Sequence, residues 1–528
     1  MEIDSYLSEI EDKYMFEFKD KQKESIENIL QLNDTVVILP TGYGKSRIYF
    51  HLPELFEKLS GEKSTVLVIS PLQALMKDQI SKLEQLNISA TVVGECQPDK
   101  GVVENIAAGK YSIVFSSPEA ALTPGLWRTS LTKGQFHSHI KAVVIDEAHC
   151  ITQWGGEFRR HYDRLAELRS VVPEKTPFVA LTATSTKSMH SEILKKLQMK
   201  PNGTKTISKL PERTNITYSL KKSSKSVHEL EWLLKDLKTN SVKTKKTVIY
   251  CRSILSCADL FEYFVSGIEH NRDILDNRLV AMYHRSTAET NKNHVLNEFP
   301  NEDSTIRIVF ATVAFGMGVD IPDIERVVHW GAPRGLEQFS QESGRAGRNG
   351  KPSQSCIYFS SFDTAKGRCN EGVRNLCQTK ECIRLELNRY FVLDNDELLE
   401  QGNHVNSTKP LCQCCSNCRL NCTCGCCVDF EFCNIHISPE NNFESDPIAR
   451  QFNDQKLKIL KDNFIDFNDY LCEEGLNRQL SFDSKFIDCL VENVSFVFCE
   501  DDIISLGLLD HDLATEILEL IEEVDMEF

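Results

Sequence analysis

The 528-residue sequence lacks any long apolar run, and it has no apolar segment near its N-terminus. A membrane-spanning helix needs about 18 or more apolar residues, and a secretory signal needs a basic segment followed by an apolar core. The opening residues, MEIDSYLSEIEDKYMF, are acidic instead. We therefore expect a soluble, intracellular protein with no membrane partner. Because the chain is too long for one hydrophobic core, we also expect two or three domains.

An overall excess of positive charge is also missing, because the formal net charge is −17. Such a charge would argue against nucleic acid as a partner if it were spread evenly along the chain. Residues 434–528, however, contain 23 acidic and 6 basic residues, which leaves 54 of each sign in residues 1–433. The body of the chain, residues 1–433, is therefore neutral overall, and the tail, residues 434–528, carries the whole excess of negative charge.

The 20 cysteines do not indicate a disulfide-rich secreted domain, because the signal that would direct the chain to an oxidising compartment is absent. Nine of them fall between Cys412 and Cys433. Metal binding is the better interpretation of that cluster.

Short β-branched runs recur at regular intervals in two parts of the body. In residues 1–200 they are TVVIL, TVLVIS, YSIVFSS, KAVVIDE and PFVALTA, and segments of helical pattern such as Lys45–Leu59 and Leu72–Leu86 follow them. After about residue 246 the pattern restarts with KTVIYC, RLVAMYH, IRIVFAT, ERVVHWG and QSCIYFS. Strands that alternate with helices predict an α/β protein with two parallel-sheet domains in tandem. We place these domains at residues 1–205 and 206–362, a small helical cysteine-rich subdomain at 363–433, and an acidic helical tail at 434–528.

A glycine-rich stretch, LPTGYGKS, follows the first predicted strand. In such a turn, backbone N–H groups bind a polyphosphate. The lysine contacts the outer phosphates, and the serine hydroxyl binds Mg²⁺. Leu39 replaces the first glycine of the usual pattern, which leaves the shorter form T-G-x-G-K-S. Upstream, FKDKQ places Lys19 and Gln22 one helix earlier, and a glutamine amide is able to pair with both edge groups of adenine. The predicted ATP-binding residues are Lys19, Gln22, Thr41, Gly42, Tyr43, Gly44, Lys45 and Ser46.

Two acidic residues, Asp146 and Glu147, follow the strand AVVI about a hundred residues later. The carboxyl end of a neighbouring strand is where Mg²⁺ that bridges two phosphates needs a ligand, and an adjacent glutamate polarises the attacking water. We predict that Ser46 and Asp146 bind magnesium and that Lys45, Asp146 and Glu147 are catalytic.

A longer set of motifs in the same order resembles the RecQ helicases of superfamily 2. The resemblance covers roughly residues 14–420 and runs through FKDKQ, LPTGYGKS, VISPLQALMKDQ, DEAHCITQWG, ALTAT, VIYCRS, YHRSTAE, ATVAFGMGVDIPDIERVVHWGAPRGLEQFSQESGRAGRNG and the cysteine segment. It implies two RecA-like domains that bind ATP between them. In related sites, arginines that contact the transferred phosphate increase the rate of phosphoryl transfer roughly 10³- to 10⁵-fold.

The resemblance assigns further residues to this reaction. It implies that Arg345 and Arg348 stabilise transition-state charge and that Gln341 orients water or phosphate. It places Asp320 at the ribose or in the coupling to DNA. Thr182 and Thr184 of ALTAT would link the nucleotide site to the arginines.

The resemblance also implies a track for single-stranded DNA, held mainly by backbone contacts without base specificity. The expected contacts are Ser70, Lys77, Arg252, Ser253, His284 and Arg285. In the aromatic-rich loop after the acids, Trp154 and Phe158 would stack on bases at roughly 1 to 3 kcal/mol per base, and Arg159 would take a phosphate or a base edge. The family usually has His, Asp and Pro where this chain has Gly156, Glu157 and Arg160, so we expect DNA binding to be kept better than its coupling to hydrolysis.

Cys382 opens the helix CIRLELNRYF, and three cysteines at x2 spacing follow it. Three thiolates at this spacing with one from a neighbouring helix are able to surround a tetrahedral zinc ion. The resemblance implies that Cys382, Cys412, Cys415 and Cys418 bind zinc, with Cys377 as the chief rival to Cys382. The cluster's other thiols would form a second zinc site, substitute as ligands or have no role.

These features together predict an ATP-dependent 3′ to 5′ DNA helicase with ATP, Mg²⁺ and Zn²⁺, which acts on single-stranded and forked DNA in recombination or repair, in the nucleus or the cytoplasm. One alternative is a DNA-stimulated ATPase without strand separation, because residues 434–528 show no basic winged helix and no HRDC domain. A second is an RNA helicase, which only the letters DEAH suggest. We expect the tail not to bind DNA directly; a helical bundle, a contact with a basic protein partner and competition for the DNA channel all remain open for it.

Overall fold

The computed structural model describes residues 2–71, 73–93, 100–123, 126–153, 161–200, 203–268, 278–316, 321–361, 363–364, 368–393, 411–423, 450, 452–473, 482–497, 500–504, 506 and 511–527. These residues fold into two compact units. The first runs from the N-terminus to Arg213, and the second begins at Thr214 and includes the C-terminal helices. The chain returns to the first unit for a short segment that begins at Asn388.

The first unit is built on a parallel sheet, whose seven strands among the described residues lie in the order β3-β4-β2-β5-β6-β1-β7. All five runs predicted in this part of the chain are strands of the sheet, and β3 and β7 add to them. The strands are β1 (Asp34–Ile38), β2 (Thr65–Ile69), β3 (Ala90–Val93), β4 (Ile113–Ser116), β5 (Ile140–Ile145), β6 (Phe178–Thr182) and β7 (Thr204–Ser208).

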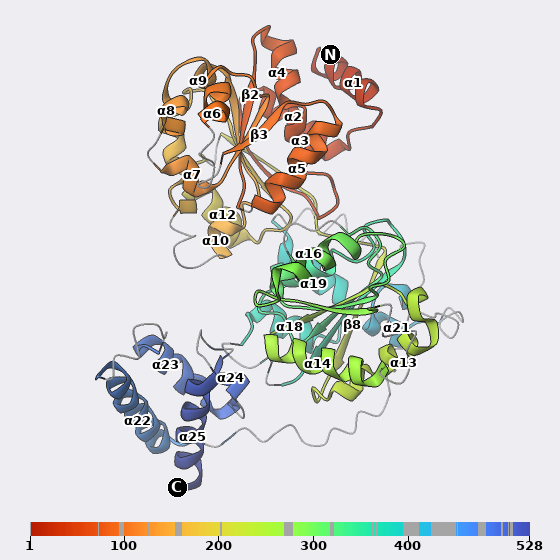
Figure 1. The fold of residues 1–528 in the computed structure, drawn as a ribbon, viewed down its shortest axis with the longest axis vertical. Helices are drawn as coiled ribbons and strands as arrows, with labels where there is room; N and C mark the ends of the chain where they lie inside the picture. The colour runs from red at the N-terminus through yellow and green to blue at the C-terminus, as the bar shows by residue number, and fades with distance from the viewer. Residues whose placement is uncertain are drawn as a thin grey trace. The chain divides into compact units, whose positions relative to one another are not determined.

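Helices cover both faces of this sheet, which explains why its central strands are apolar on both sides (Figure 1). On one face lie α1 (Glu2–Tyr14), α2 (Asp20–Leu30), α3 (Ser46–Phe50), α4 (Leu52–Ser60) and α5 (Gln73–Gln85). On the other lie α6 (Lys100–Ala107), α7 (Pro118–Leu122), α8 (Leu126–Thr132), α9 (Gln135–His139), α10 (Cys150–Gln153), η1 (Leu165–Ser170) and α12 (Lys187–Lys196). The single helix predicted at Lys45–Leu59 is divided at His51, because Pro53 has no N–H group and sits best in a new first turn.

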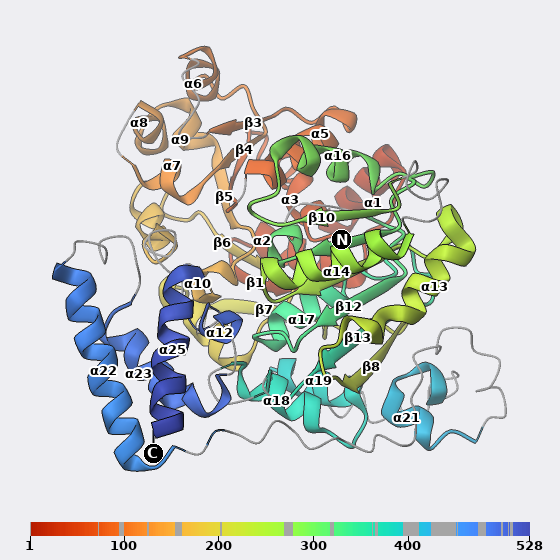
Figure 2. The ribbon, with the colours of Figure 1, turned by 60° about the horizontal axis from the view of Figure 1, so that its bottom comes forward.

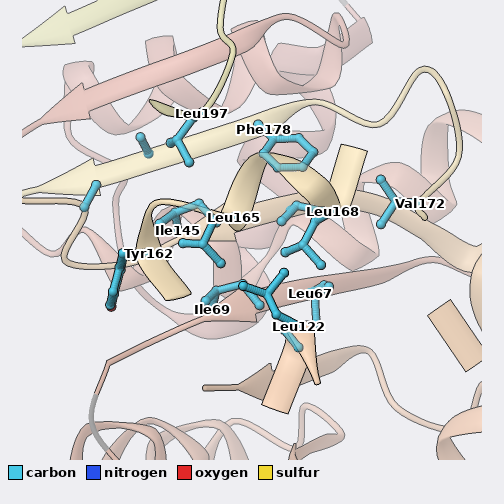
Figure 3. Close-up of a cluster of buried hydrophobic side chains, with 14 of the residues drawn as sticks. Leu67, Ile69, Leu122, Ile145, Tyr162, Leu165, Leu168, Val172, Phe178 and Leu197 are labelled. Carbon is cyan, nitrogen blue, oxygen red and sulfur yellow. The ribbon is translucent and has the colours of Figure 1, made fainter. Parts of the chain in front are cut away.

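The hydrophobic core of the second face supports the end of β5. Ile69 and Ile145 are the last residues of β2 and β5, and they belong to the same buried cluster as Leu165 and Leu168 of η1 (Figure 3). Close packing on all sides leaves the backbone at this point little freedom. The residue that follows Ile145 is Asp146, so this core sets the position of the predicted acids.

The second unit contains another parallel sheet, with six strands in the order β10-β11-β9-β12-β13-β8 in the part of the chain that is described. Figure 2 shows β12, β13 and β8 side by side. Its strands are β8 (Ile216–Lys222), β9 (Thr247–Cys251), β10 (Val280–Tyr283), β11 (Ile308–Ala311), β12 (Arg326–Trp330) and β13 (Ser353–Phe359). Its helices are η2 (Val227–Leu230), α13 (Glu231–Asn240), η3 (Ser241–Lys243), α14 (Ile254–Ile268), α16 (Glu289–Glu298), η4 (Val313–Gly316), α17 (Leu336–Ser343) and α18 (Glu371–Gln378).

The described residues of the C-terminal part of the chain are mainly helical. The cysteine segment contains α19 (Ile383–Phe391), η6 (Leu411–Gln413) and α21 (Ser416–Leu420). The acidic tail contains α22 (Asp454–Glu473), α23 (Ser484–Asn493), η9 (Val494–Phe496), α24 (Glu500–Ile504) and α25 (His511–Glu527), which bury a hydrophobic core of their own. Among the described helices, none is both long enough and apolar enough to cross a bilayer.

Candidate functional site

The segment after β1 has the backbone of a phosphate-binding loop. Gly42 and Gly44 have φ values of 80° and 91°, in the left-handed region that side chains rarely adopt. The N–H of Tyr43 donates to the carbonyl of Pro40 at 3.0 Å, which closes the turn. The Nζ of Lys45 donates to the carbonyl of Leu39 at 3.1 Å. The side chain of Lys45 therefore lies across the loop that is predicted to bind the phosphates.

Gln22 ties the upstream motif to this loop. Its amide Nε2 donates to the carbonyls of Tyr43 and Gly44 at 3.1 and 2.8 Å, and its Oε1 accepts from the N–H of Lys19 at 2.9 Å. The Nζ of Lys19 lies 4.5 Å from the centre of the Tyr43 ring, a cation–π distance. Burial and two neighbouring cations lower the pKa of Lys19. The structure thus brings together the residues predicted to bind the nucleotide.

The predicted acids lie at the same edge of the sheet as the loop, because β6 alone separates β5 from β1. Glu147 has a φ of 49°, and its N–H donates to Oδ1 of Asp146 at 3.0 Å. Burial and, to a smaller degree, the charge of Glu147 raise the pKa of Asp146 to about 7, although the charge of Lys45 opposes the rise. Two carboxylates and the Ser46 hydroxyl are the hard oxygen donors that Mg²⁺ prefers, and a divalent cation would offset the charge that burial disfavours.

A buried histidine connects Glu147 to the ALTAT motif. The Nδ1 of His149 lies 3.3 Å from Oε2 of Glu147 and 3.3 Å from Oγ1 of Thr182. The Thr182 hydroxyl donates to the carbonyl of Thr184 at 2.9 Å. Burial lowers the pKa of His149, which favours the neutral imidazole. Sequence reasoning did not select His149, although the letters DEAH contained it.

The predicted arginines of the second unit follow α17. Arg345 is buried and Arg348 is half-buried, and Gln341 lies on α17 itself, half-buried. Burial raises the pKa of Tyr250 on β9, and the charges of Arg345 and Arg348 both oppose that rise. Both guanidinium groups are therefore close enough to the same phenol to act on it electrostatically.

A second buried pair, which the sequence analysis missed, holds the base of this arginine segment. The Nε2 of His329 lies 3.0 Å from Oε2 of Glu342, and both side chains are buried. The amide of Gln338 donates to Oε1 of Glu342 at 3.0 Å. The N–H of Arg345 donates to the carbonyl of Glu342 at 3.1 Å. The carboxylate of Glu342 is thus fixed next to the turn that carries the arginines.

Among the residues predicted to contact DNA in the first unit, Ser70 is buried at the end of β2 and Lys77 is exposed on α5. The predicted aromatic-loop residues Trp154, Phe158 and Arg159 lie outside the described residues, and so does Asp320. Their roles stay predictions.

In the second unit the predicted strand contacts have intramolecular partners. The Ser253 hydroxyl accepts from the N–H of Ser256 at 3.0 Å and so caps the start of α14. His284 is buried, and its N–H donates to the Thr287 hydroxyl at 3.0 Å. Only 16% of the Arg252 side chain is exposed. A direct contact between Arg252 and a DNA strand therefore requires groups around this side chain to move.

Four cysteines of the second unit have sulfur atoms within 4.8 Å of one another, and these are Cys382, Cys414, Cys415 and Cys418. Tetrahedral zinc with Zn–S bonds of about 2.3 Å needs thiolates about this close together. The thiols of Cys382 and Cys414 hold the pKa of Cys415 far below its ordinary value, which favours a thiolate. The set differs from the predicted one in one member, because Cys414 stands where Cys412 was expected. Cys412 is buried in η6, and the rival Cys377 is buried in α18.

The cysteine cluster is joined to the edge of the second sheet. The N–H of Tyr218 on β8 donates to the carbonyl of Cys414 at 3.3 Å, and the Thr217 hydroxyl donates to the carbonyl of Gln413 at 2.9 Å. A β-bridge pairs Tyr218 with Cys415. The cysteine segment therefore covers backbone groups of an edge strand, which are otherwise free to pair with another chain.

Comparisons with known proteins agree with this arrangement. The DEAD/DEAH box helicase model matches residues 19–192, and the helicase conserved C-terminal domain model matches residues 225–350. The ATP-dependent DNA helicase RecQ of Haemophilus influenzae is 30% identical over 397 residues, which are 71% of this chain and 59% of that protein. A putative ATP-dependent RNA helicase, R290, of Acanthamoeba polyphaga mimivirus is 29% identical over 81% of this chain and 73% of its own length. The structure of the DEAD-box helicase Mss116 bound to ssRNA and UDP-BeF shares the fold, with a TM-score of 0.54 and 13% identity over 94% of this chain and 87% of that one.

Two parallel sheets in tandem, with a phosphate loop and adjacent acids at the edge of the first, define the two-domain RecA-like architecture of helicases. Within that class, the chain is similar to DNA helicases of the RecQ family, at 30% to 33% identity. It spans between about half and three fifths of the length of the relatives that it matches first.

Proposed function

We propose that the chain is an ATP-driven motor of the RecQ type that moves 3′ to 5′ along single-stranded DNA and separates duplex and forked DNA in recombination and repair, with the nucleus as its compartment. The observation that carries the proposal is the joint placement of Lys45, Asp146 and Glu147 at one edge of the first sheet, where the charge of Lys45 acts on Asp146. A cation beside two half-buried carboxylates is an arrangement suited to phosphoryl transfer.

Each residue of the site has a proposed role. Lys45 neutralises charge on the outer phosphates of ATP, and Ser46 and Asp146 hold Mg²⁺. When bound, Mg²⁺ supplies charge neutralisation at the phosphate oxygens. Glu147 accepts the proton of the attacking water, held in place by the contact of its carboxylate with His149 at 3.3 Å. Arg345 and Arg348 stabilise the negative charge that develops in the transition state, and Gln341 orients water or phosphate.

The cysteine cluster is proposed to hold a structural zinc ion through Cys382, Cys414, Cys415 and Cys418. Because the cysteine segment pairs with β8, the ion would help to order the edge of the second sheet. Structural zinc sites supply about 10 to 16 kcal/mol of apparent binding free energy, which is enough to order a small subdomain.

Steady-state ATP hydrolysis with and without single-stranded DNA tests the proposal. Wild-type protein is expected to hydrolyse ATP faster when the strand is present. Lys45→Ala should lower kcat at least about a hundredfold, because the cation that faces the phosphates is removed, while DNA binding is kept. Lys58→Ala is the matched control, since Lys58 forms a surface pair with Glu9 at 2.5 Å. Retained hydrolysis in Lys45→Ala would contradict the phosphate assignment.

A second candidate function is RNA unwinding, which the printed name of the mimivirus relative favours. Stimulation of hydrolysis by DNA and RNA strands of the same sequence distinguishes the two. The DNA proposal expects the DNA strand to stimulate more strongly. A DNA-stimulated ATPase that does not separate strands remains the other alternative, and a strand-displacement assay decides it.

A further inference from the structure

A cluster of cations lies at the carboxyl ends of β9 and β12, which are neighbours in the second sheet. Arg252 follows β9, and Gly331 follows β12 with a φ of 110°. A Cβ atom on Gly331 would lie 2.9 Å from Cδ of Arg252 and 2.9 Å from Nζ of Lys225. Only glycine leaves room for both side chains at this position. The fold thus crowds positive groups at the edge of a parallel sheet where α/β proteins commonly bind ligands.

One acid of the sheet domain lies within this cluster. The carboxylate of Asp363 is 3.0 Å from Nζ of Lys225 and 3.7 Å from Nη1 of Arg252. Burial by itself would raise the pKa of Asp363, but the charges of Lys225 and Arg252 outweigh it and lower the pKa. The guanidinium of Arg252 also donates to the carbonyl of Arg368 at 2.7 Å, so Arg368 belongs to the same cluster.

The second acid comes from the tail. Nη1 of Arg368 donates to the carbonyl of Asp502 at 2.9 Å, and its Nη2 lies 3.8 Å from Oδ1 of Asp502. The side chains of Arg368 and Asp502 are only 6% and 10% exposed. Asp502 lies on α24, whose neighbours α22, α23 and α25 share a separate hydrophobic core. A residue of the acidic tail therefore covers a buried arginine of the motor domain.

The charges of the cluster explain why an anion is favoured there. Burial and the charge of Arg252 lower the pKa of Arg368 to about 10, although the charge of Asp502 opposes this change. The exposed Arg334 adds a charge that lowers the pKa of the half-buried Arg252 and of the buried Arg368. Without Asp502, the carboxylate of Asp363 would face Lys225 and three arginines. A surplus of cations at a partly buried position favours a bound anion, and paired guanidinium groups suit the oxygens of a phosphate.

We propose that Arg368, with Arg252 and Arg334, binds a backbone phosphate of the DNA strand, and that the Asp502 carboxylate occupies this position when no strand is bound. The inference rests on the proposed function, because Arg252 belongs to the motif expected to contact the strand. The tail carries the whole net charge of −17 and repels a polyanion, so the strand and the docked tail exclude each other. The tail is thus an internal competitor that lowers affinity for DNA.

The test measures the anisotropy of a labelled single-stranded oligonucleotide titrated with the full-length chain. Asp502→Asn keeps the backbone carbonyl that Arg368 contacts but removes the competing charge, and it should tighten binding roughly fivefold or more. Asp488→Asn is the matched control. Asp488 is also a tail acid, but its side chain is 57% exposed and pairs with Lys461 on the tail itself. This control should bind DNA as the wild-type chain does.

Two arginine variants test the site itself. Arg368→Gln should weaken binding and reduce the slope of log K against log salt by about one, because one phosphate contact is lost. Arg368→Lys keeps the charge and should show a smaller loss. In the Arg368→Gln background, Asp502→Asn should give no further gain, since the two residues act at one position. Thermal unfolding of each variant shows that the comparison is between folded proteins.

The outcomes separate the two proposals. If no variant binds or is stimulated by DNA, the proposed function fails. If the wild-type chain binds DNA but Asp502→Asn changes affinity no more than Asp488→Asn does, the proposed competition is wrong. It is also wrong if Asp502→Asn tightens binding equally with Arg368→Gln present, because the gain would then come from net charge alone.

Discussion

Asp146 and Glu147 are adjacent, half-buried carboxylates, and Lys45 is the cation whose charge opposes the rise in the pKa of Asp146. Bringing two negative charges together away from water is costly unless a cation accompanies them. That cost makes the site ready for a metal ion and a phosphate. At this scale the motif residues were predictable from the sequence, because their spacing is local. The roles of His149, His329 and Glu342 were not predicted, because their contacts depend on how a loop, a strand and a helix pack together.

Arg345→Lys and Arg348→Lys are expected to lower kcat for ATP about a hundredfold or more, with little change in KM. Lysine keeps the positive charge but loses the planar pair of donors that spreads over phosphate oxygens. Steady-state kinetics with saturating DNA measures the effect. Arg326→Lys is the control, because Arg326 pairs with Asp236 at 2.6 Å on the same domain. An unchanged kcat in both loop variants would remove these arginines from the reaction.

Gln22→Ala is expected to raise KM for ATP several-fold and to lower the free energy of unfolding by about 1 to 3 kcal/mol. The substitution leaves the carbonyls of Tyr43 and Gly44 without their donor from the amide. Nucleotide titration and denaturant unfolding give the two values. Gln31→Ala, at an exposed position on the end of the same helix, should change neither. Equal behaviour of the two variants would show that the contact does not shape the loop.

At the scale of elements, the ten apolar runs predicted as strands are strands of the two sheets. Three strands were missed, β3, β7 and β8, and each lies at an edge of its sheet. β7 reads TKTIS and buries only one of its five residues, and β8 reads ITYSLKK with only its first three buried. Edge strands have one neighbour and need little apolar surface, so hydrophobic pattern does not reveal them. Cys414 of the four-cysteine cluster was also missed, because spacing along the chain does not show whether Cys412 or Cys414 lies beside Cys415.

Cys414→Ala is expected to lose bound zinc, whereas Cys412→Ala and Cys377→Ala should retain it. The reason is that the Cys414 thiol lies within the group of four and the other two do not. Metal content of the purified proteins by atomic emission measures this directly. The opposite result, with zinc lost from Cys412→Ala and kept in Cys414→Ala, would restore the set predicted from spacing.

Removal of zinc by a chelator is expected to speed hydrogen exchange at the Tyr218 amide and to lower Tm. The Tyr218 N–H donates to the Cys414 carbonyl, so disorder of the cysteine segment would expose it. Amides in the central strand β9 should exchange as before in the folded state. Exchange at Tyr218 that does not respond to zinc would separate the metal from the order of this edge.

At the scale of the whole molecule, two domains of one architecture carry different chemistry at the ends of their strands. The first unit holds the phosphate loop and the acids, and the second holds the arginine segment, the cysteine cluster and the acidic tail. The duplication and the charge distribution were predictable from composition and periodicity along the chain. The contact of Asp502 with Arg368 was not, because it joins residues 134 apart in the sequence.

Strand displacement on two duplexes that differ only in the end that carries the single-stranded tail tests whether the protein is an ATP-driven DNA motor with 3′ to 5′ polarity. We expect ATP-dependent separation of the duplex with a 3′ tail, little separation of the duplex with a 5′ tail, and none of either by Lys45→Ala. ATP hydrolysis stimulated by both substrates without separation of either would contradict the proposed motor function and leave a DNA-stimulated ATPase.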